Sequence, residues 1–390
     1  MLSRNGVPFA FYPVDSPQGR QLVRDFSVDL ARLPALIRHD GSVLHDPSFA
    51  DIADAHGIQV QPAADVYDLA VLGAGPAGLA ASVYGASEGL HTVVIEQLAI
   101  GGQAGTSSLI RNYLGFARGI SGGELAHRAW QQAVLFGAQF VFTHQALGFT
   151  AGADHHLVTL DDGSQAVARA VIIATGVTYR RLGIPGLDRF VGTGVFYGAA
   201  GVEAPAMAGQ EVHVIGGANS AGQAALHLAR FAHRVTLLVR GQSLAAGMSD
   251  YLVRQLEETP NIDVLLSTRV VDGSGTSHLE AVTLEDVGTR RQKEVPAAAV
   301  FVLIGAEPHT DWLRDVVELD ERGFVLTGRD IPQSAWPGPR APLAFETSVA
   351  GVFAAGDVRY GSVKRVAGAV GEGSVTVGSV HRYLADLGDL

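Results

Sequence analysis

The chain has 390 residues, of which 47% are hydrophobic and 17% charged, so it is long enough for several folded domains with buried cores. Its formal net charge of −11 argues against a nucleic-acid partner, because binding a phosphate backbone needs clustered Lys and Arg. The absence of cysteine excludes a disulfide framework, a thiolate metal site and a thiol nucleophile. His155 and His156 have no further ligand near them in the sequence, so we expect no metal.

The first residues lack an apolar core followed by a small-residue cleavage site, so we expect no secretory signal. The uncharged run 69–86 is about as long as a membrane span. Its glycines and Pro76 instead favour a strand followed by a tight turn. We therefore expect a cytoplasmic protein with no membrane partner.

A first segment extends to about residue 60 and is predicted to hold short elements, before a linker over 61–65. These elements are a strand over 7–15, a helix over 16–26, two strands within 33–44 around the turn Asp40-Gly41, and a helix over 48–58 with Ser48 at its N-cap and Gly57 past its end.

The pattern of strand, glycine turn, helix and strand then occurs twice, over 67–97 and 210–240. Two such βαβ units predict two nucleotide-binding domains, each a parallel sheet with helices on its faces. Residues 157–176 predict a β-meander that turns at Asp162-Gly163, and residues 373–387 predict a final helix.

The first unit contains GAGPAG directly after an apolar strand. In this motif Gly73 permits the tight turn, Gly75 lets the backbone approach a pyrophosphate, and Gly78 lets helix and strand pack closely. Glu96 ends the next strand, where a carboxylate can accept hydrogen bonds from a ribose.

A second element, TSVAGVFAAGDV over 347–358, is an apolar strand that ends in Gly356-Asp357. Either Asp357 binds the sugar-like chain of a flavin dinucleotide, or it is a turn residue after a buried strand. Both readings of these residues stay open.

From residue 66 to its end the chain resembles the low-molecular-weight bacterial thioredoxin reductases, in GAGPAG, GGQAGTSSLIRNYLGF, IIATG, FVLIGAEPHTDWL, TSVAGVFAAGDV and KRVAGAVGEG. The resemblance implies an α/β fold with two Rossmann-like three-layer domains, FAD as cofactor, NADPH or NADH as its reductant, and a homodimer whose lobes rotate. The FAD-binding residues that it implies are Gly73, Gly75, Pro76, Ala77, Gly78, Glu96, Gly102, Gln103, Asn112, Gln145, Thr175, Gly356, Asp357, Arg365 and Val366.

The resemblance also suggests domain boundaries. Residues 66–184 and 312–390 form the two parts of an FAD-binding domain, and 185–311 form an NAD(P)H-binding-like domain. Residues 1–60 look like part of a glutaredoxin- or thioredoxin-like fold, which makes Pro34 a cis-proline. Because the redox-active first half of that fold is missing, an interaction or dimerisation role is favoured for this segment.

Three departures from the family pattern concern its chemistry. Gly198 and Gly201 stand where the family has its redox cysteines, and disulfide exchange needs a thiolate to attack sulfur. In the second glycine motif, the position that should approach a pyrophosphate is Ala218, whose methyl group can hinder that approach. Of the family's usual arginines for the NADPH 2′-phosphate, Arg240 remains. The residues left for NAD(P)H are Gly216, Asn219, Ser220, Ala221 and Arg240.

Catalytic side chains are not evident from the sequence. Tyr197 is a candidate to line the site and Glu203 to serve as an acid or base, although a packing aromatic and a carboxylate in a helix first turn are the favoured explanations.

The leading hypothesis is an FAD-dependent oxidoreductase that moves electrons between NAD(P)H, or an organic substrate, and a non-disulfide acceptor such as a quinone, another flavin, a carrier protein or dioxygen. A non-catalytic flavin-binding sensor or partner-binding module, and a biosynthetic flavin oxidase, are the alternatives.

Overall fold

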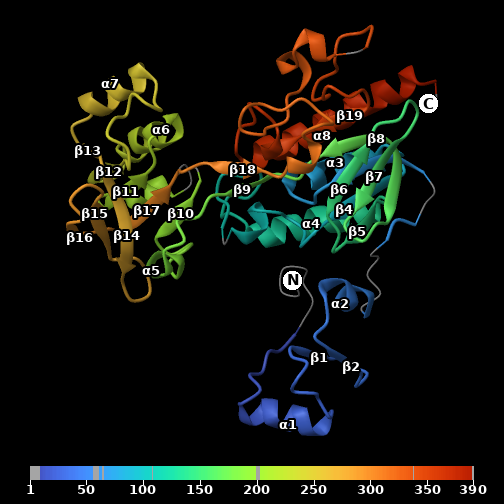
Figure 1. Cartoon of the computed structure of the whole chain (residues 1–390), viewed down its shortest axis with the longest axis horizontal. Helices are drawn as coiled ribbons and strands as arrows, with labels where there is room; N and C mark the ends of the chain where they lie inside the picture. The colour runs from blue at the N-terminus through green and yellow to red at the C-terminus, as the bar shows by residue number, and fades with distance from the viewer. Residues whose placement is uncertain are drawn as a thin grey trace. The chain divides into compact units, whose positions relative to one another are not determined.

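The computed structural model of the chain describes residues 9–55, 61–63, 66–107, 109–198, 203–336 and 338–388, without the side chains of residues 49 and 50. Its backbone divides into two compact units. The first combines 1–107, 120–176 and 308–390, and the second combines 108–119 and 177–307 (Figure 1). The domain boundaries given above stay predictions.

The N-terminal segment contains α1 (Pro17–Asp25), β1 (Ala35–Ile37), β2 (Val43–His45) and α2 (Phe49–Ala55). The helix at 16–26 and the hairpin are confirmed: Ser16 caps α1 through its side chain, and β1 and β2 pair antiparallel. The strand predicted over 7–15 is wrong in its described part, since residues 9–15 form no strand. The apolar residues there do not form a strand, because no described strand pairs with them. The Leu33–Pro34 peptide bond is cis, and Gly57 lies outside the described residues.

The first unit is built on a seven-stranded sheet. Its strands follow the order β5-β4-β3-β8-β7-β6, with β19 also paired to β8. The strands β5, β4, β3, β8 and β19 are parallel, whereas β8, β7 and β6 form the predicted antiparallel meander. The elements are β3 (Tyr67–Leu72), α3 (Pro76–Ser87), β4 (Thr92–Glu96), η2 (Ala104–Thr106), α4 (Gly122–Leu135), β5 (Gln139–Phe142), β6 (Ala146–Thr150), β7 (His156–Leu160), β8 (Gln165–Ile173), η4 (Asp311–Leu313), η5 (Gly328–Asp330), η6 (Gln333–Ala335), β19 (Val352–Ala354), η7 (Gly356–Val358) and α8 (Val366–Asp386).

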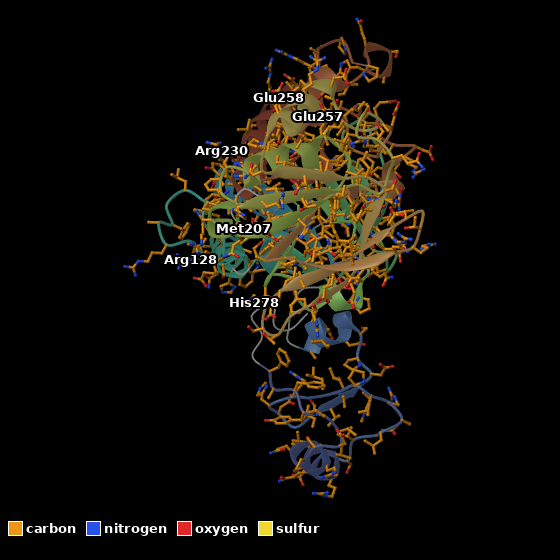
Figure 2. All side chains as sticks on the ribbon, turned by 90° about the vertical axis from the view of Figure 1, so that its left-hand side faces the viewer. Arg128, Met207, Arg230, Glu257, Glu258 and His278 are labelled. Atoms are coloured by element: carbon orange, nitrogen blue, oxygen red, sulfur yellow. The ribbon has the colours of Figure 1, made fainter. Side chains whose placement is uncertain are left out.

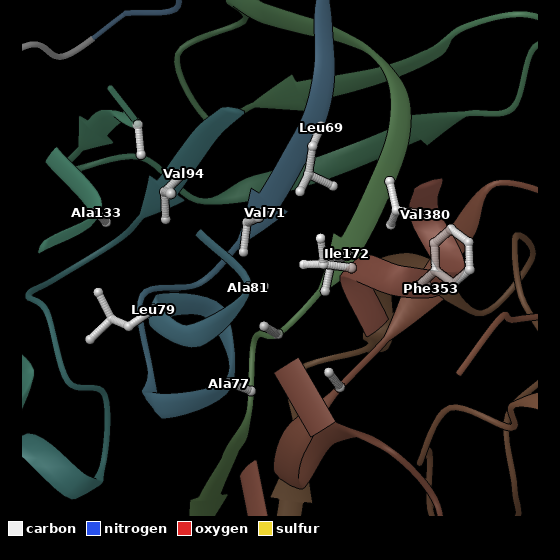
Figure 3. Close-up of a cluster of buried hydrophobic side chains, with 14 of the residues drawn as sticks. Leu69, Val71, Ala77, Leu79, Ala81, Val94, Ala133, Ile172, Phe353 and Val380 are labelled. Carbon is white, nitrogen blue, oxygen red and sulfur yellow. The ribbon is translucent and has the colours of Figure 1, made fainter. Parts of the chain in front are cut away.

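One face of this sheet packs against α3 and α8 (Figure 3). Leu69 and Ile172 are fully buried beneath α3, and Phe353 lies between the sheet and α8. Glycine brings the two helices together, because a Cβ at Gly373 of α8 would collide with the backbone carbonyl of Ala77 on α3.

The final helix was predicted to begin at residue 373, but α8 begins at Val366. Three glycines in its first turns, at 368, 371 and 373, lower its intrinsic helix propensity. Close packing against α3 at Gly373 outweighs this low propensity. The start of the helix was therefore predicted too late in the sequence.

The second unit contains a five-stranded parallel sheet with the order β10-β17-β11-β12-β13 and an antiparallel three-stranded meander, β14-β15-β16. The βαβ pattern predicted for 210–240 is confirmed. Its elements, with the short pair β9 and β18, are β9 (Val177–Tyr179), α5 (Pro185–Asp188), β10 (Val195–Tyr197), η3 (Ala204–Met207), β11 (Glu211–Ile215), α6 (Asn219–Leu228), β12 (Arg234–Leu238), α7 (Asp250–Glu258), β13 (Ile262–Leu265), β14 (Thr268–Ser274), β15 (Ala281–Asp286), β16 (Gln292–Pro296), β17 (Ala299–Val302) and β18 (Ala306–Pro308).

Exposed charged side chains on the helices include Arg128 on α4 and Glu257 and Glu258 at the end of α7 (Figure 2). Among the described residues, no helix combines the length and the apolar character needed to cross a membrane.

One buried histidine makes the stability of the first unit depend on pH. His156 is 1% exposed and stacks on Phe149, and burial lowers the pKa of its imidazole to about 4, opposed by the backbone of Ala350. His156 binds a proton near pH 6.5 in the unfolded chain but only near pH 4 in the folded chain. The free energy of unfolding therefore falls as the pH drops between these two values.

We expect His156→Phe to remove this contribution. Between pH 7 and pH 5, the variant should lose less stability than the wild type, by up to about 2 kcal/mol. Urea unfolding at both pH values checks this, and an equal loss in both proteins would contradict it.

Candidate cofactor site

The first glycine turn, between β3 and α3, has three glycines in three different environments. Gly73 has φ +105°, and a Cβ there would lie 2.5 Å from the carbonyl oxygen of Ala174. A Cβ at Gly78 would collide with the carbonyl of Gly73. At Gly75 a Cβ would meet nothing within 4 Å, so the protein leaves open space at this position. Gly73 and Gly78 are thus required by packing, whereas Gly75 leaves room for a ligand.

The turn is uncapped at the start of α3. Gly75 is the N-cap, and no side chain in the described part of the chain accepts from the first-turn N–H groups. Pro76 has no N–H, but the N–H groups from Ala77 onward in the first turn are therefore available to an anionic group.

A second glycine turn faces the first. The N–H of Gly101 donates to the carbonyl of Ala74 at 2.7 Å, and a Cβ at Gly102 would lie 3.2 Å from Cα of Gly75. Both Gly101 and Gly102 have positive φ. The exposed Gln103 follows directly and precedes η2. The two turns therefore border the same open space.

Glu96 ends β4 with a carboxylate that is 8% exposed. Its Oε2 accepts from the N–H of Ala74 at 2.7 Å, and its Oε1 accepts from the N–H groups of Leu98 and Ala99 at 2.8 and 3.1 Å. Since a carboxylate offers about four acceptor positions, a further one is left at Oε2 beside the glycine turn. Glu96 can thus hold the turn and accept from one ribose hydroxyl.

Gly356 lies where α3 and α8 meet. It has φ +79°, and a Cβ there would lie 2.8 Å from Cβ of Ala77 and 3.7 Å from Cβ of Ala369. The next residue, Asp357, has a carboxylate that accepts no hydrogen bond from the described part of the chain. Burial raises the pKa of Asp357, opposed by the charge of Lys364 and assisted by that of Glu372. A ligand hydroxyl would satisfy this carboxylate.

Glu372 and Arg359 were missed by the sequence reasoning, although they hold this turn. Glu372, on α8, accepts from the N–H of Gly356 at 2.8 Å and pairs with Arg359 at 2.7 Å. Both side chains are mostly buried, at 13% and 15% exposure. Glu372 is the acidic residue of the sequence KRVAGAVGEG, and it is the one signal in the sequence from which its role could have been predicted.

The remaining residues implied for FAD are placed as follows. Arg365 is the N-cap of α8 and Val366 its first residue, again without a side-chain cap. Thr175 follows β8, and its Cα would lie 3.3 Å from a Cβ at Gly73. Gln145 accepts from the side chain of Gln97 at 3.0 Å, beyond the end of β4. Asn112 lies in 108–119, which belongs to the second unit, so its assignment to FAD stays a prediction.

The first unit therefore offers two facing glycine turns, two uncapped helix N-termini and two carboxylates at the carboxyl edge of its parallel sheet. This edge is where open α/β sheets bind dinucleotides. The open space at Gly75 and the carboxylate of Asp357, which accepts no hydrogen bond from the described residues, fit a flavin dinucleotide.

The second unit has a related turn between β11 and α6. Gly216 has φ +152°, and a Cβ there would lie 2.8 Å from Cβ of Ala221. Ala218 is the N-cap of α6 in an ordinary extended conformation, so its backbone does not need glycine. Oδ1 of Asn219 accepts from the N–H of Ser249 at 2.8 Å, which ties the loop before α7 to the turn. Ser220 and Arg240 are exposed.

The region of the missing cysteines is described only in part. Gly198 has φ +94°, and a Cβ there would lie 3.3 Å from the ring of Tyr179. Gly201 lies outside the described residues. The hydroxyl of Tyr197 accepts from the N–H of Leu182 at 3.3 Å, and Glu203 directly precedes η3. These contacts give Tyr197 a structural role.

One group of potential metal ligands occurs among the described residues. Nδ1 of His144 lies 2.7 Å from the carboxylate of Asp161, and Nε2 lies 3.7 Å from that of Asp162. Each ring nitrogen faces a carboxylate, so side-chain contacts within the group explain its arrangement without an ion. The absence of metal stays a prediction.

The fold and site define a protein of two dinucleotide-binding units. Residues 67–373 match the family described as pyridine nucleotide-disulphide oxidoreductase. The chain is 36% identical over 301 residues to thioredoxin reductase of Treponema pallidum, which covers 77% of this chain and 91% of that protein. It is 34% identical over 294 residues to the bifunctional thioredoxin reductase/thioredoxin of Mycobacterium leprae, covering 75% of this chain and 60% of that protein.

Among solved structures, thioredoxin reductase from Streptococcus pyogenes superposes with a TM-score of 0.74 at 30% identity, covering 82% of this chain and 99% of that chain. The protein therefore belongs to the pyridine nucleotide-disulphide oxidoreductase family, and its fold is of the thioredoxin reductase type.

Proposed function

We propose that this protein is an FAD-dependent oxidoreductase that passes electrons from NAD(P)H, or from an organic substrate, to an acceptor that is not a disulfide. The single observation that carries the proposal is chemical. The first unit has a cradle of two facing glycine turns that suits a dinucleotide, while none of the 390 residues is a cysteine. Disulfide reduction proceeds by attack of a thiolate on sulfur, and these residues supply no thiolate.

Each part of the chain has a role in this proposal. Residues 66–184 and 312–390 hold FAD, 185–311 hold the nicotinamide dinucleotide, and 1–60 serve in interaction between copies or with a partner. The chain acts as a homodimer. FAD supplies the hydride-accepting and electron-donating chemistry when bound. The protein would orient it: N–H groups of α3 and α8 would be available to its phosphates, and Glu96 and Asp357 would accept from its hydroxyls.

A flavin-binding sensor is the second candidate, favoured by the nicotinamide side. Ala218 stands where the glycine motif should let the backbone approach a pyrophosphate. The side chain of Asn219 already accepts a hydrogen bond from the N–H of Ser249, and Arg240 is the one arginine directly after β12. Weak binding of NAD(P)H would follow from these features.

The test is steady-state turnover with two kinds of acceptor under anaerobic conditions. We expect NADPH or NADH to be oxidised with menadione, a quinone, but not with oxidised thioredoxin or an aromatic disulfide. N-ethylmaleimide should leave the rate unchanged, because no thiol is present. Enzyme-dependent reduction of either disulfide would refute the proposal, and no turnover with any acceptor would favour the sensor.

A further inference from the structure

Lys364, in the loop between η7 and α8, is held beside the carboxylate that is proposed to bind FAD. Its Nζ donates to the backbone carbonyl of Asp357 at 2.7 Å and lies 4.5 Å from the centre of the Phe324 ring. The carbonyl and the aromatic ring both favour an ammonium group at this place. Since Lys364 is partly buried, water screens its charge less than that of a fully exposed lysine.

Further charged groups surround this lysine. Glu372 pairs with Arg359 at 2.7 Å, so its carboxylate already has a cationic partner. The carboxylate of Asp357, in contrast, accepts no hydrogen bond from the described residues. Asp320 adds a negative charge near Lys364, and Arg359 adds a positive one. Of the groups in the described part of the chain that act on Asp357, Lys364 is the cation and Glu372 the anion.

Burial and the charge of Lys364 act in opposite directions on Asp357. Burial raises the pKa of the Asp357 carboxyl, opposed by the charge of Lys364 and assisted by that of Glu372. Burial also lowers the pKa of Lys364, but its ordinary pKa lies far above that of a carboxyl group. The ammonium is therefore charged at the pH at which Asp357 would take up a proton. Without this charge, Asp357 would keep a proton up to a higher pH.

We propose that Lys364 keeps Asp357 ionised in weakly acidic solution, so that FAD binding to this carboxylate does not depend on pH; the inference rests on the proposed binding of FAD. An ionised carboxylate is purely an acceptor, and its bond to a hydroxyl is about twice as strong as that of a neutral group. Protonation of Asp357 would weaken that bond. Lys364 is thus a positioning residue, which acts on FAD through Asp357.

The test measures the affinity of the FAD-stripped full chain for FAD, from the change in flavin fluorescence, at about pH 8 and about pH 6. Lys364→Met removes the charge and keeps an unbranched side chain. Relative to the wild type at the same pH, we expect it to bind within about threefold at the higher pH and at least about tenfold more weakly at the lower pH. Lys364→Arg keeps the charge and should follow the wild type at both.

Two controls separate this role from others. Lys293→Met removes the chain's other lysine, which is exposed on β16, and should leave FAD affinity unchanged. Asparagine does not titrate, so Lys364→Met should cause no additional loss at low pH when it is combined with Asp357→Asn.

An equal loss at both pH values in Lys364→Met, no loss at either, or a pH-dependent loss that persists beside Asp357→Asn would each overturn the inference. If Lys364→Met does not fold, Lys364→Gln takes its place, with the same expected result. A wild type that binds no FAD would overturn the proposed function, and this inference with it. Normal FAD binding by the wild type with a pH-independent Lys364→Met would overturn the inference alone.

Discussion

Gly78→Ala is expected to destabilise the first unit by about 3 kcal/mol or more, because overpacking a close contact forces the backbone to shift. The added Cβ would collide with the carbonyl oxygen of Gly73 and would lie 3.3 Å from a methyl group of Val71. Urea unfolding of the protein stripped of FAD measures the loss.

Gly75→Ala is the matched control, three residues earlier in the same motif. Its Cβ would meet no protein atom within 4 Å, so the stripped protein should unfold at the wild-type urea concentration. FAD affinity should nevertheless fall about 10- to 100-fold, since the methyl group would occupy the space left for the pyrophosphate. FAD binding by Gly75→Ala as tight as that of the wild type would contradict the role of Gly75 in leaving space for the ligand. Wild-type stability of Gly78→Ala would contradict the role of Gly78 in packing.

Arg340→Ala is expected to cost about 3 to 5 kcal/mol of unfolding free energy, because it leaves a buried carboxylate without its counterion. Glu346 is completely buried and accepts from both terminal nitrogens of Arg340, at 2.6 and 2.8 Å. Hydrogen bonding to Glu346 raises the pKa of Arg340. Two backbone N–H groups, of Leu343 and Gly351, also donate to this carboxylate and would remain. Thermal or urea unfolding of the holoenzyme measures the change.

Arg314→Ala provides the comparison for that prediction. Arg314 pairs with Asp311 at 2.9 Å, but both side chains are largely exposed, at 73% and 91%. Exposed pairs contribute little to stability, so no measurable change is expected. Equal effects of the two arginine substitutions would show that burial of Glu346 does not determine the stability.

The sheet framework could be predicted from the sequence because its signals are local. An apolar strand followed by GAGPAG defines the turn after β3, and the second glycine motif defines the turn after β11. The strand predicted over 7–15 failed because a strand needs a pairing partner, which a local pattern does not contain.

The polar contacts around the cofactor cradle were less accessible. Glu372 and Gly356 are 16 residues apart, and Thr175 and His309 are 134 residues apart. Only the fold brings such pairs together, so periodicity and spacing along the chain give no sign of them. The predicted FAD residues at the two turns lie at one edge of the sheet of the first unit, Asn112 belongs to the second unit, and the assignment of all of them to FAD stays a prediction.

The most direct test of the central claim is an anaerobic titration of the purified holoenzyme with NADPH and with NADH, followed by the flavin absorbance. The account predicts that one of the two bleaches the flavin with one equivalent per bound FAD. A requirement for a second equivalent, as a disulfide would impose, or no bleaching at high concentrations of both, would contradict it.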